Sequence, residues 1–286
     1  MRIPDDPIAA LLPLPGVLDA VAEARAAVDA LLGHRVLRRG SAEVTAESAL
    51  RGARASAELE GAGIELERLR GQLMGGGTVT LPSKQERGAV VVQGAVRLHA
   101  DLGQLLVPWR HSPRQALARL HVLAAADLVD DPDALGRPRP AGVVPHDPVG
   151  IGPAPEPVEV AARLDGLARV LTAGTSAPAV VVAAVVHGEL MALRAFGTAD
   201  GLVARAAARL VLVDRGLDPK AVSAPEVGHL EQGGAHGAGD VGYADALRAY
   251  VTGRPEGVAT WLVHCARAVA LGAREGLAVC EAIRRT

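Results

Sequence analysis

Signals that begin and end helices recur along this sequence, and they constrain the fold more than any other feature. Residues 17–32 have the apolar spacing of a helix and stop at Gly33, and residues 42–59 stop just before Gly61 and Gly63. Glycine commonly terminates helices, whereas the alternating pattern of a half-buried strand is rare in this chain. The sequence therefore predicts a mainly α-helical protein.

Further helix starts follow a glycine-rich break at residues 75–77. Ser83 and Glu86 have the spacing of a capping box, and Ser112 precedes Pro113 at a second start. We predict helices over residues 88–106, 112–127, 158–171, 179–193, 202–215, 240–250 and 256–285.

The composition limits how these helices can pack. Hydrophobic residues make up 49% of the chain, but aromatic residues only 2%. The core must therefore be built mostly from Ala, Val and Leu, whose small volumes favour closely packed helices.

Charge argues against a nucleic-acid partner. The formal net charge is −2, and basic and acidic residues are mixed along the chain. No broad positive field is available to hold a phosphate backbone, so we expect no nucleic-acid binding.

Cysteine usage and hydropathy favour a cytoplasmic protein. Cys265 and Cys280 lie in one helical pattern, about 22 Å apart along the axis, which excludes a disulfide within that helix. The longest apolar stretch, residues 177–186, is half a membrane span, and residues 1–15 lack the pattern of a secretory signal. We expect free thiols and no membrane insertion.

Residues 130–157 interrupt the helical pattern. This segment is rich in proline and glycine. Its two short stretches at residues 136–140 and 143–151 could pair, and we predict a small β-hairpin there.

Three segments, in order, resemble the Fic (filamentation-induced-by-cAMP, or Fido) family. Residues 56–61 match the family's inhibitory helix, with Ser56, Glu60 and Gly61 at its signature positions. The predicted hairpin, with Arg139, Val143 and Val144, resembles the flap that clamps the target segment. Residues 187–219 resemble the family's central helix, turn and second helix. The resemblance implies a Fic-like helical bundle with a small β-hairpin flap and an N-terminal helical extension, divided into an extension at 1–82 and a core at 83–286.

The catalytic signature of the family is substituted in this chain. The family pattern is His, x, Phe, x, Asp or Glu, Gly, Asn, Gly, Arg, two residues, Arg. The matching positions here hold Arg194, Phe196, Thr198, Ala199, Asp200, Gly201, Leu202 and Arg205.

These substitutions remove the chemistry that the resemblance implies. The family's His accepts a proton from the target hydroxyl, but Arg194 stays charged and cannot act as a base. Thr198 replaces the carboxylate that holds magnesium, which prefers carboxylate oxygens. We therefore expect no cofactor, with binding of ATP and magnesium disfavoured.

The turn after Thr198 keeps some anion-binding character. Backbone N–H groups at a helix start attract phosphate whatever the side chains are. The Asp200 carboxylate would repel a phosphate, and its simpler interpretation is a cap on the following helix. Gly201 keeps the glycine of the family.

Glu60 and Arg205 are predicted to form an ion pair between two helices. In the family, the second Arg of the signature is the partner of the inhibitory Glu. The competing interpretation is that Glu60 and Arg205 face solvent separately.

The histidines suggest two weak metal candidates. His187 and Glu189 are two residues apart on a helix and point in nearly opposite directions, so they cannot share an ion. His229, Glu231 and His236 match no familiar zinc spacing. We predict no metal site.

The sequence thus predicts a degenerate Fic-like pseudoenzyme, inactive as a protein AMP-transferase and acting as a binding or regulatory module. The alternative is a retargeted enzyme that handles a phosphate-containing substrate through Arg194 and Arg205. An unidentified protein partner and a homodimer both stay open.

Overall fold

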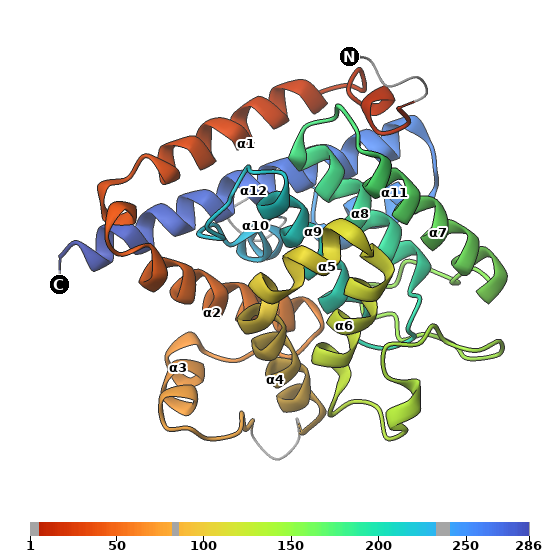
Figure 1. The fold of residues 1–286 in the computed structure, drawn as a ribbon, viewed down its shortest axis with the longest axis horizontal. Coiled ribbons are helices and arrows are strands. Elements are labelled where there is room, and N and C mark those ends of the chain that lie inside the picture. Colours follow the sequence, from red (N-terminus) through yellow and green to blue (C-terminus); the bar gives the residue numbers. More distant parts are fainter. Residues whose placement is uncertain (1–5, 82–85, 233–240, 286) are drawn as a thin grey trace.

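The computed structural model describes residues 6–81, 86–232 and 241–285, and within these ranges the chain is a bundle of helices with no strand (Figure 1). The N-terminal part contains α1 (Val17–Leu32), α2 (Ser41–Leu59) and α3 (Leu66–Met74), with short 3-10 helices at Ala9–Leu11 and Arg35–Arg38. The predicted mainly α-helical class is therefore confirmed.

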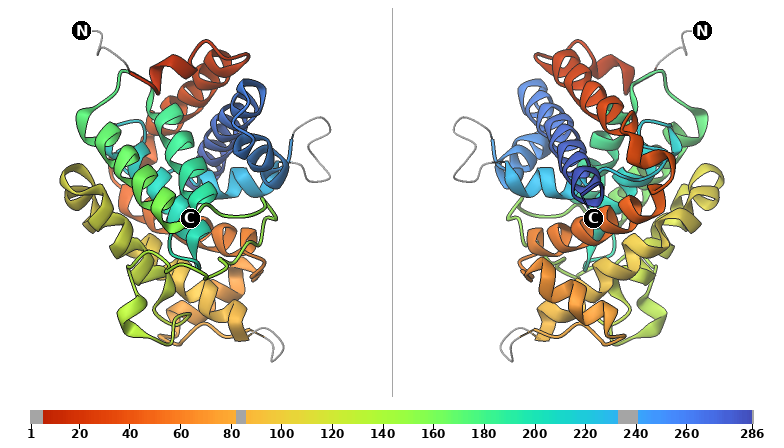
Figure 2. Two further views of the ribbon diagram at one scale, coloured as in Figure 1. Left: turned by 90° about the vertical axis from the view of Figure 1, so that its right-hand side faces the viewer. Right: turned by 90° about the vertical axis from the view of Figure 1, so that its left-hand side faces the viewer.

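The last helix, α12 (Pro255–Ile283), spans 29 residues, and α1 lies along one side of it (Figures 1 and 2). It also packs against α2, α8, α10 and α11. Close approach depends on glycine: a Cβ built on Gly272 would lie 2.5 Å from the backbone of Ala224. Small residues thus let neighbouring backbones come into contact, as the scarcity of large rings predicts.

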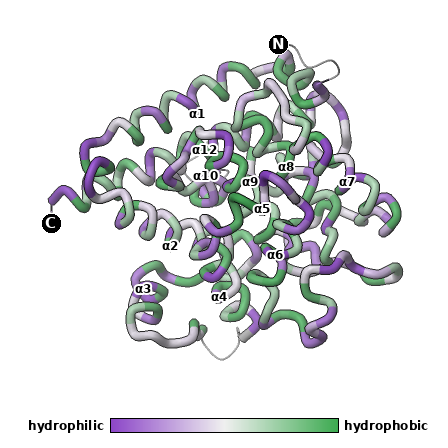
Figure 3. The backbone as a smooth tube through the Cα atoms, in the orientation of Figure 1, coloured by the Kyte–Doolittle hydropathy of each residue, from purple (hydrophilic) through white to green (hydrophobic). Residues whose placement is uncertain are grey.

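The amphipathic pattern of α1 matches its place at the edge of the bundle. Its buried residues are Val17, Ala20, Ala24, Val28 and Leu31, which recur every three or four positions. Hydrophilic and hydrophobic segments alternate along its tube in Figure 3. One face therefore packs on α12 while the other faces solvent.

The centre of the bundle is the pair α8 (Ala179–Leu193) and α9 (Asp200–Asp214), which pack against each other. Nearly every residue of α8 is buried, as expected for a helix that is hydrophobic on all sides. A six-residue turn, 194–199, joins the two helices. The substituted signature lies in this turn and in the first turns of α9.

The remaining helices surround this pair. They are α4 (Glu86–Asp101), α5 (Leu106–His111), α6 (Pro113–Ala125), α7 (Pro157–Ala173), α10 (Pro225–Glu231) and α11 (Tyr243–Val251), with short 3-10 helices at Leu102–Leu105 and Pro132–Ala134.

Most predicted helices are present, and three α-helices of the described residues are missing from the prediction. The bounds of α1 agree with the predicted 17–32, and α8 agrees with the predicted 179–193. Helices α3, α5 and α10 were not predicted. The helix predicted over 88–106 ends at Asp101, five residues before Leu106. Pro108 lies in the separate helix α5, and its missing N–H cannot bond to the preceding turn. Ser83 and Asp240, two predicted helix starts, lie outside the described residues.

The predicted β-hairpin is wrong. Residues 136–156 form an irregular loop, in which the N–H of Arg139 donates to the carbonyl of Ala195 and the N–H of His146 donates to the carbonyl of Gly197. A hairpin needs donors from both of its strands, but proline occupies residues 138, 140, 145, 148, 153 and 155. The loop therefore bonds to the turn 194–199 through its backbone and forms no strand ladder.

One hydrophobic cluster includes buried residues from Ile8 to Cys280 and unites both parts of the chain. The boundary predicted at residues 82 and 83 stays a prediction. Cys265 and Cys280 are buried and free on α12. Among the described residues, no helix is both long and apolar enough to cross a membrane.

Candidate functional site

The turn 194–199 has a strained backbone. Arg194 has φ 41° and Ala199 has φ 54°, both in the left-handed region that side chains rarely adopt. Each costs on the order of 1–3 kcal/mol and persists only where the surrounding contacts hold it in place. The family pattern has glycine at the position of Ala199, which here adopts this conformation with a Cβ.

The guanidinium of Arg194 points into the loop 136–156. Its Nη2 donates to the carbonyl of Gly152 at 2.7 Å, and its Nη1 lies 2.9 Å from Asp147 Oδ2. Asp147 in turn accepts from the N–H groups of Gly150 and Gly152. Burial lowers the pKa of Arg194, and the charge of Asp147 opposes that effect. Arg194 therefore anchors the loop.

A second arginine fixes the same loop from its other end. Arg139 is buried, and its Nε donates to the carbonyl of Arg194 at 3.1 Å. Its other nitrogens donate to the carbonyls of Val143 and Pro155. Val143 is 44% exposed and Val144 is 89% exposed, so the loop presents two apolar side chains to solvent.

Phe196 and Thr198 contribute little polarity to the turn. The ring of Phe196 stacks on His121, with centroids 4.4 Å apart and planes 7° from parallel. Burial lowers the pKa of His121 to about 4, so this ring is neutral near pH 7. Thr198 is half-buried beside it.

Asp200 is the first residue of α9 and is buried. Its Oδ1 accepts from the N–H of Phe196 at 2.9 Å, so the carboxyl group turns back toward the turn instead of capping the later N–H groups of α9. Its Oδ2 has no hydrogen-bond partner within the described part of the chain. Burial raises the pKa of Asp200 to about 7, against the effect of the Phe196 hydrogen bond.

Arg205 and Glu60 lie within ion-pair distance, at 2.7 Å between Nη2 and Oε1, and both side chains are almost fully buried. Arg205 also donates from Nε to Ser56 Oγ at 2.7 Å and from Nη2 to the Ser56 carbonyl at 3.0 Å. Its Nη1 donates to the Tyr243 hydroxyl at 3.2 Å. The guanidinium is therefore surrounded by acceptors from α2 and α11.

Glu60 lies directly on the start of α9. A Cβ built on Gly201 would lie 1.9 Å from Glu60 Oε1, so glycine is required for this contact. Gly61, with φ 82°, ends α2 just after Glu60. The Glu60 carboxylate therefore covers the start of α9, where the resemblance to the Fic family implies a phosphate-binding site.

The face of α2 toward α9 repeats every four residues: Ser48, Gly52, Ser56, Glu60. Arg205 and Arg209 are also four residues apart on α9, so both sets line one side of their helices. A Cβ built on Gly52 would lie 2.7 Å from Arg209 Nη1, which shows how closely the two helices approach.

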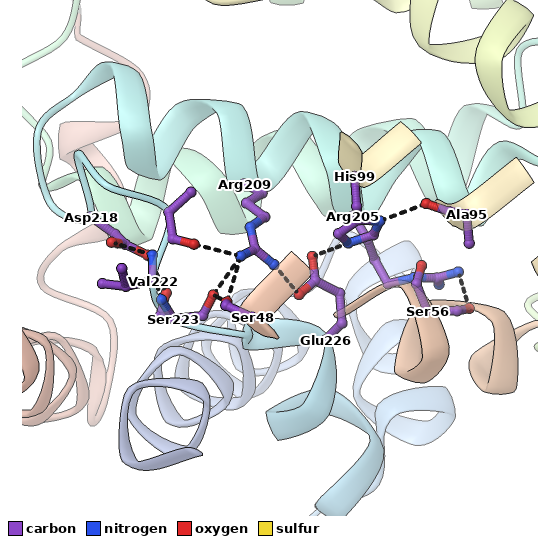
Figure 4. A network of polar contacts seen from close by, with 11 residues as sticks. Ser48, Ser56, Ala95, His99, Arg205, Arg209, Asp218, Val222, Ser223 and Glu226 are labelled. Carbon is purple, nitrogen blue, oxygen red and sulfur yellow. Dashed lines mark hydrogen bonds and ion pairs between the residues drawn. The ribbon is translucent and has the colours of Figure 1, made fainter. Parts of the chain in front are cut away.

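Figure 4 shows the second half of this contact, centred on Arg209. Arg209 donates to Ser48 Oγ at 2.8 Å, to the Ser223 carbonyl at 2.7 Å and to Glu226 Oε2 at 3.0 Å. Glu226 Oε1 lies 3.3 Å from His99 Nε2. Although burial raises the pKa of Glu226, Arg209 and His99 hold it well below its usual range.

Arg209 and Glu226 were not predicted as partners. The signal that could have found them is the spacing of four residues shared by the two arginines and by Ser48, Gly52, Ser56 and Glu60. Glu226 itself carries no such signal, because α10 is short and follows an irregular segment.

The two signature arginines line different cavities. Arg194 lines an open pocket of about 460 Å³ together with Arg163 and Glu189. Arg205 lines an internal cavity of about 20 Å³, which holds no more than one water-sized group. The structure does not bring Arg194 and Arg205 together in one groove.

The structure also gives separate partners to His187 and Glu189, which the sequence excluded as a metal site. His187 Nε2 lies 2.9 Å from the Tyr243 hydroxyl, whereas Glu189 accepts from Tyr250 and Arg163. His229 lies on α10 and is buried, and His236 lies outside the described residues.

Solved structures of Fic proteins share this fold. A Fic family protein from Desulfovibrio desulfuricans G20 aligns with a TM-score of 0.71 at 20% identity, covering 93% of this chain and 75% of that one. Residues 134–508 of Fic-1 from C. elegans align with a TM-score of 0.67 at 15% identity, covering 93% and 73%.

A third structure aligns with this chain over nearly its whole length. A Fic domain containing signaling protein from Bacteroides thetaiotaomicron VPI-5482 aligns with a TM-score of 0.59 at 13% identity, covering 92% of this chain and 98% of that one. No family model and no curated protein matches the sequence. The chain therefore has the fold of Fic proteins.

Proposed function

We propose that this Fic-fold protein does not transfer AMP and acts as a binding or regulatory module. The observation that carries the proposal is the position of Arg194. It stands where the family has its catalytic His, and its guanidinium bonds to Asp147 and to the carbonyl of Gly152. A permanently charged group engaged in this way cannot accept a proton from a target hydroxyl.

The covered helix start supports the same proposal. A nucleotide phosphate at the N-terminus of α9 would have to displace the Glu60 carboxylate from Gly201 and Arg205. It would also approach Asp200, whose carboxyl group is turned into the same turn. Like charges and an occupied position both disfavour phosphate there.

The loop 136–156 is the surface that we propose for a protein partner. It exposes Val143 and Val144, and the neighbouring open groove of about 850 Å³ is lined in part by Pro138, Leu164 and Phe196. Because Arg139 and Arg194 hold the loop in place, a partner would meet a preformed surface and lose little free energy in ordering it.

The alternative of a retargeted phosphate enzyme has less support. That mechanism needs Arg194 and Arg205 to bind one anion between them, but they line separate cavities. Arg205 also donates to Ser56, Glu60 and Tyr243 already.

The test is equilibrium binding of a nucleotide panel, with and without magnesium, to the wild type and to Glu60→Gly. We expect no binding and no AMP transfer by either protein. Glu58→Gly is the matched control, because Glu58 lies on the same turn of α2 but pairs with Arg54 near the surface. Thermal unfolding of each variant checks that it is folded.

Nucleotide binding that appears in Glu60→Gly, but not in Glu58→Gly, would contradict the proposal. It would mean that the helix start still accepts phosphate and that α2 gates it.

A further inference from the structure

Three helices bring two histidines and a cysteine together behind Arg205. His187 comes from α8, His229 from α10 and Cys265 from α12. Their ligand atoms all lie within 4.8 Å of one another, and each of the three residues is at most 5% exposed. No sequence motif predicts this cluster, because the three residues are spread over 79 positions of the chain.

A small internal cavity adjoins the cluster. The same three side chains line it, together with Arg205 and Glu226, and its volume is about 20 Å³. A cavity of about 10–15 Å³ is enough to hold one water-sized group. The side chains therefore leave room for a single ion.

Hydrogen bonds determine which nitrogen of His229 can bind an ion. A backbone carbonyl only accepts, so His264 Nδ1–H donates to the carbonyl of Val241 at 3.1 Å. His264 Nε2 lies 3.0 Å from His229 Nδ1. This contact occupies Nδ1 of His229 and leaves Nε2 as the nitrogen that can bind an ion.

His187 has a corresponding outer partner. Its Nε2 lies 2.9 Å from the Tyr243 oxygen, and a proton on Nε2 would leave the lone pair on Nδ1. Histidines that bind metals commonly donate their other ring N–H in this way, which fixes the orientation of the ring. His187 and His229 thus both have a second hydrogen-bonded residue behind them.

We propose that His187, His229 and Cys265 form a binding site for one Zn²⁺ ion. Two imidazole nitrogens and one thiolate suit Zn²⁺, whereas Mg²⁺ and Ca²⁺ prefer oxygen ligands. On binding, Zn²⁺ replaces the proton of the Cys265 thiol, and this proton passes to the buffer. Zinc bonds of about 2.0–2.3 Å require the ligand atoms to lie about 3.4–3.7 Å apart, so the three side chains move together slightly.

This inference is independent of the proposed function, because it uses none of the signature side chains as ligands. It departs from the expectation from the sequence that the chain has no metal site, which stays a prediction. That expectation considered only histidines and acids close together in the chain.

The test is titration of the full chain with Zn²⁺ alone, after treatment with a chelator under reducing conditions, in competition with a chromogenic chelator. We expect one equivalent to bind to the wild type and to Cys280→Ala. Binding should weaken by at least about 10-fold in Cys265→Ala. Cys280 is the matched control, because it is the other buried cysteine of α12.

A second measurement needs no variant and so does not depend on how Cys265→Ala folds. X-ray absorption of the zinc-loaded wild type should show one sulfur and two nitrogen ligands. Failure of the wild type to bind zinc, unchanged binding by a folded Cys265→Ala, or a zinc shell without sulfur would each overturn the proposal.

Discussion

At the scale of single residues, the main feature of this molecule is the burial of charged side chains. Arg205 and Glu60 are a buried pair, and a buried pair need not add net stability because desolvation offsets the attraction. Removal of one partner destabilises the fold, because the remaining charge is still desolvated and no longer has an opposite charge beside it. The signature positions that survive in this chain are therefore structurally important.

Glu60→Ala should lower the free energy of unfolding by about 3–5 kcal/mol, because Arg205 loses its only carboxylate partner among the described residues. Glu58→Ala should cost less than about 1 kcal/mol, since its pair with Arg54 is more than a quarter exposed on both sides. Urea unfolding of the two variants measures this difference. Equal losses would mean that the burial of the Glu60 pair is unimportant.

Asp200→Asn should remove part of the pH dependence of stability. Burial raises the pKa of Asp200 from 3.8 to about 7, so between these values the folded chain keeps a proton that the unfolded chain loses. Stability therefore falls as the pH rises from about 4 to 7, and the penalty is complete above 7.

The stabilisation by Asp200→Asn should consequently grow from pH 5 to pH 8, by up to a few kcal/mol. Urea unfolding at both pH values measures it, with Asp19→Asn on the exposed face of α1 as the control. A benefit that is the same at both pH values would show that Asp200 ionises normally.

At the scale of helices, the contact between α2 and α9 depends on the absence of side chains. Gly52 and Gly201 stand where any Cβ would meet a buried charged group. The arginines of α9 can therefore reach the backbone and hydroxyl groups of α2 directly, and the two helices form a polar layer inside the core.

Gly52→Ala should destabilise the protein by about 1–3 kcal/mol, because its Cβ would lie within 3 Å of Arg209 and Glu226. Gly166→Ala on α7 is the matched control, since nothing lies within 4 Å of its Cβ. That change should stabilise the protein by roughly 0.5–1 kcal/mol, as alanine favours helix. Denaturant unfolding would contradict this account if both changes had the same sign.

At the scale of the whole molecule, the N-terminal part and the core share one hydrophobic cluster. Helix α1 lies along α12, and α2 lies against α4, α9 and α10. The shared cluster joins the two parts across the residues that the structure describes, which favours unfolding as one cooperative unit.

The two tryptophans can test this cooperativity. Trp109 is on α5 and Trp261 on α12, both are buried, and both belong to the shared cluster. Urea transitions followed by fluorescence in Trp109→Phe and Trp261→Phe should each coincide with the circular dichroism transition of the same variant. Fluorescence and dichroism midpoints that separate within either variant would indicate that parts of the chain unfold independently.

The sequence predicted the helical class because helix ends carry local signals such as Gly33 and Pro113. It did not predict the course of residues 136–156, because the partners of this loop come from residues 194–197, far along the chain. The pairing of Glu60 with Arg205 could be predicted from the resemblance to the Fic family. The cluster of His187, His229 and Cys265 could not be predicted, since only the folded chain brings their helices together.

Because Arg194 anchors the loop 136–156, the residues that position 194 can tolerate depend on the loop as well as on the turn. Arg194→His would release Asp147 and the carbonyl of Gly152 and so free the loop. A histidine at this position would therefore need another anchor for the loop. In evolutionary terms, position 194 is epistatic with position 147, because a change at one alters which residues the other can accept.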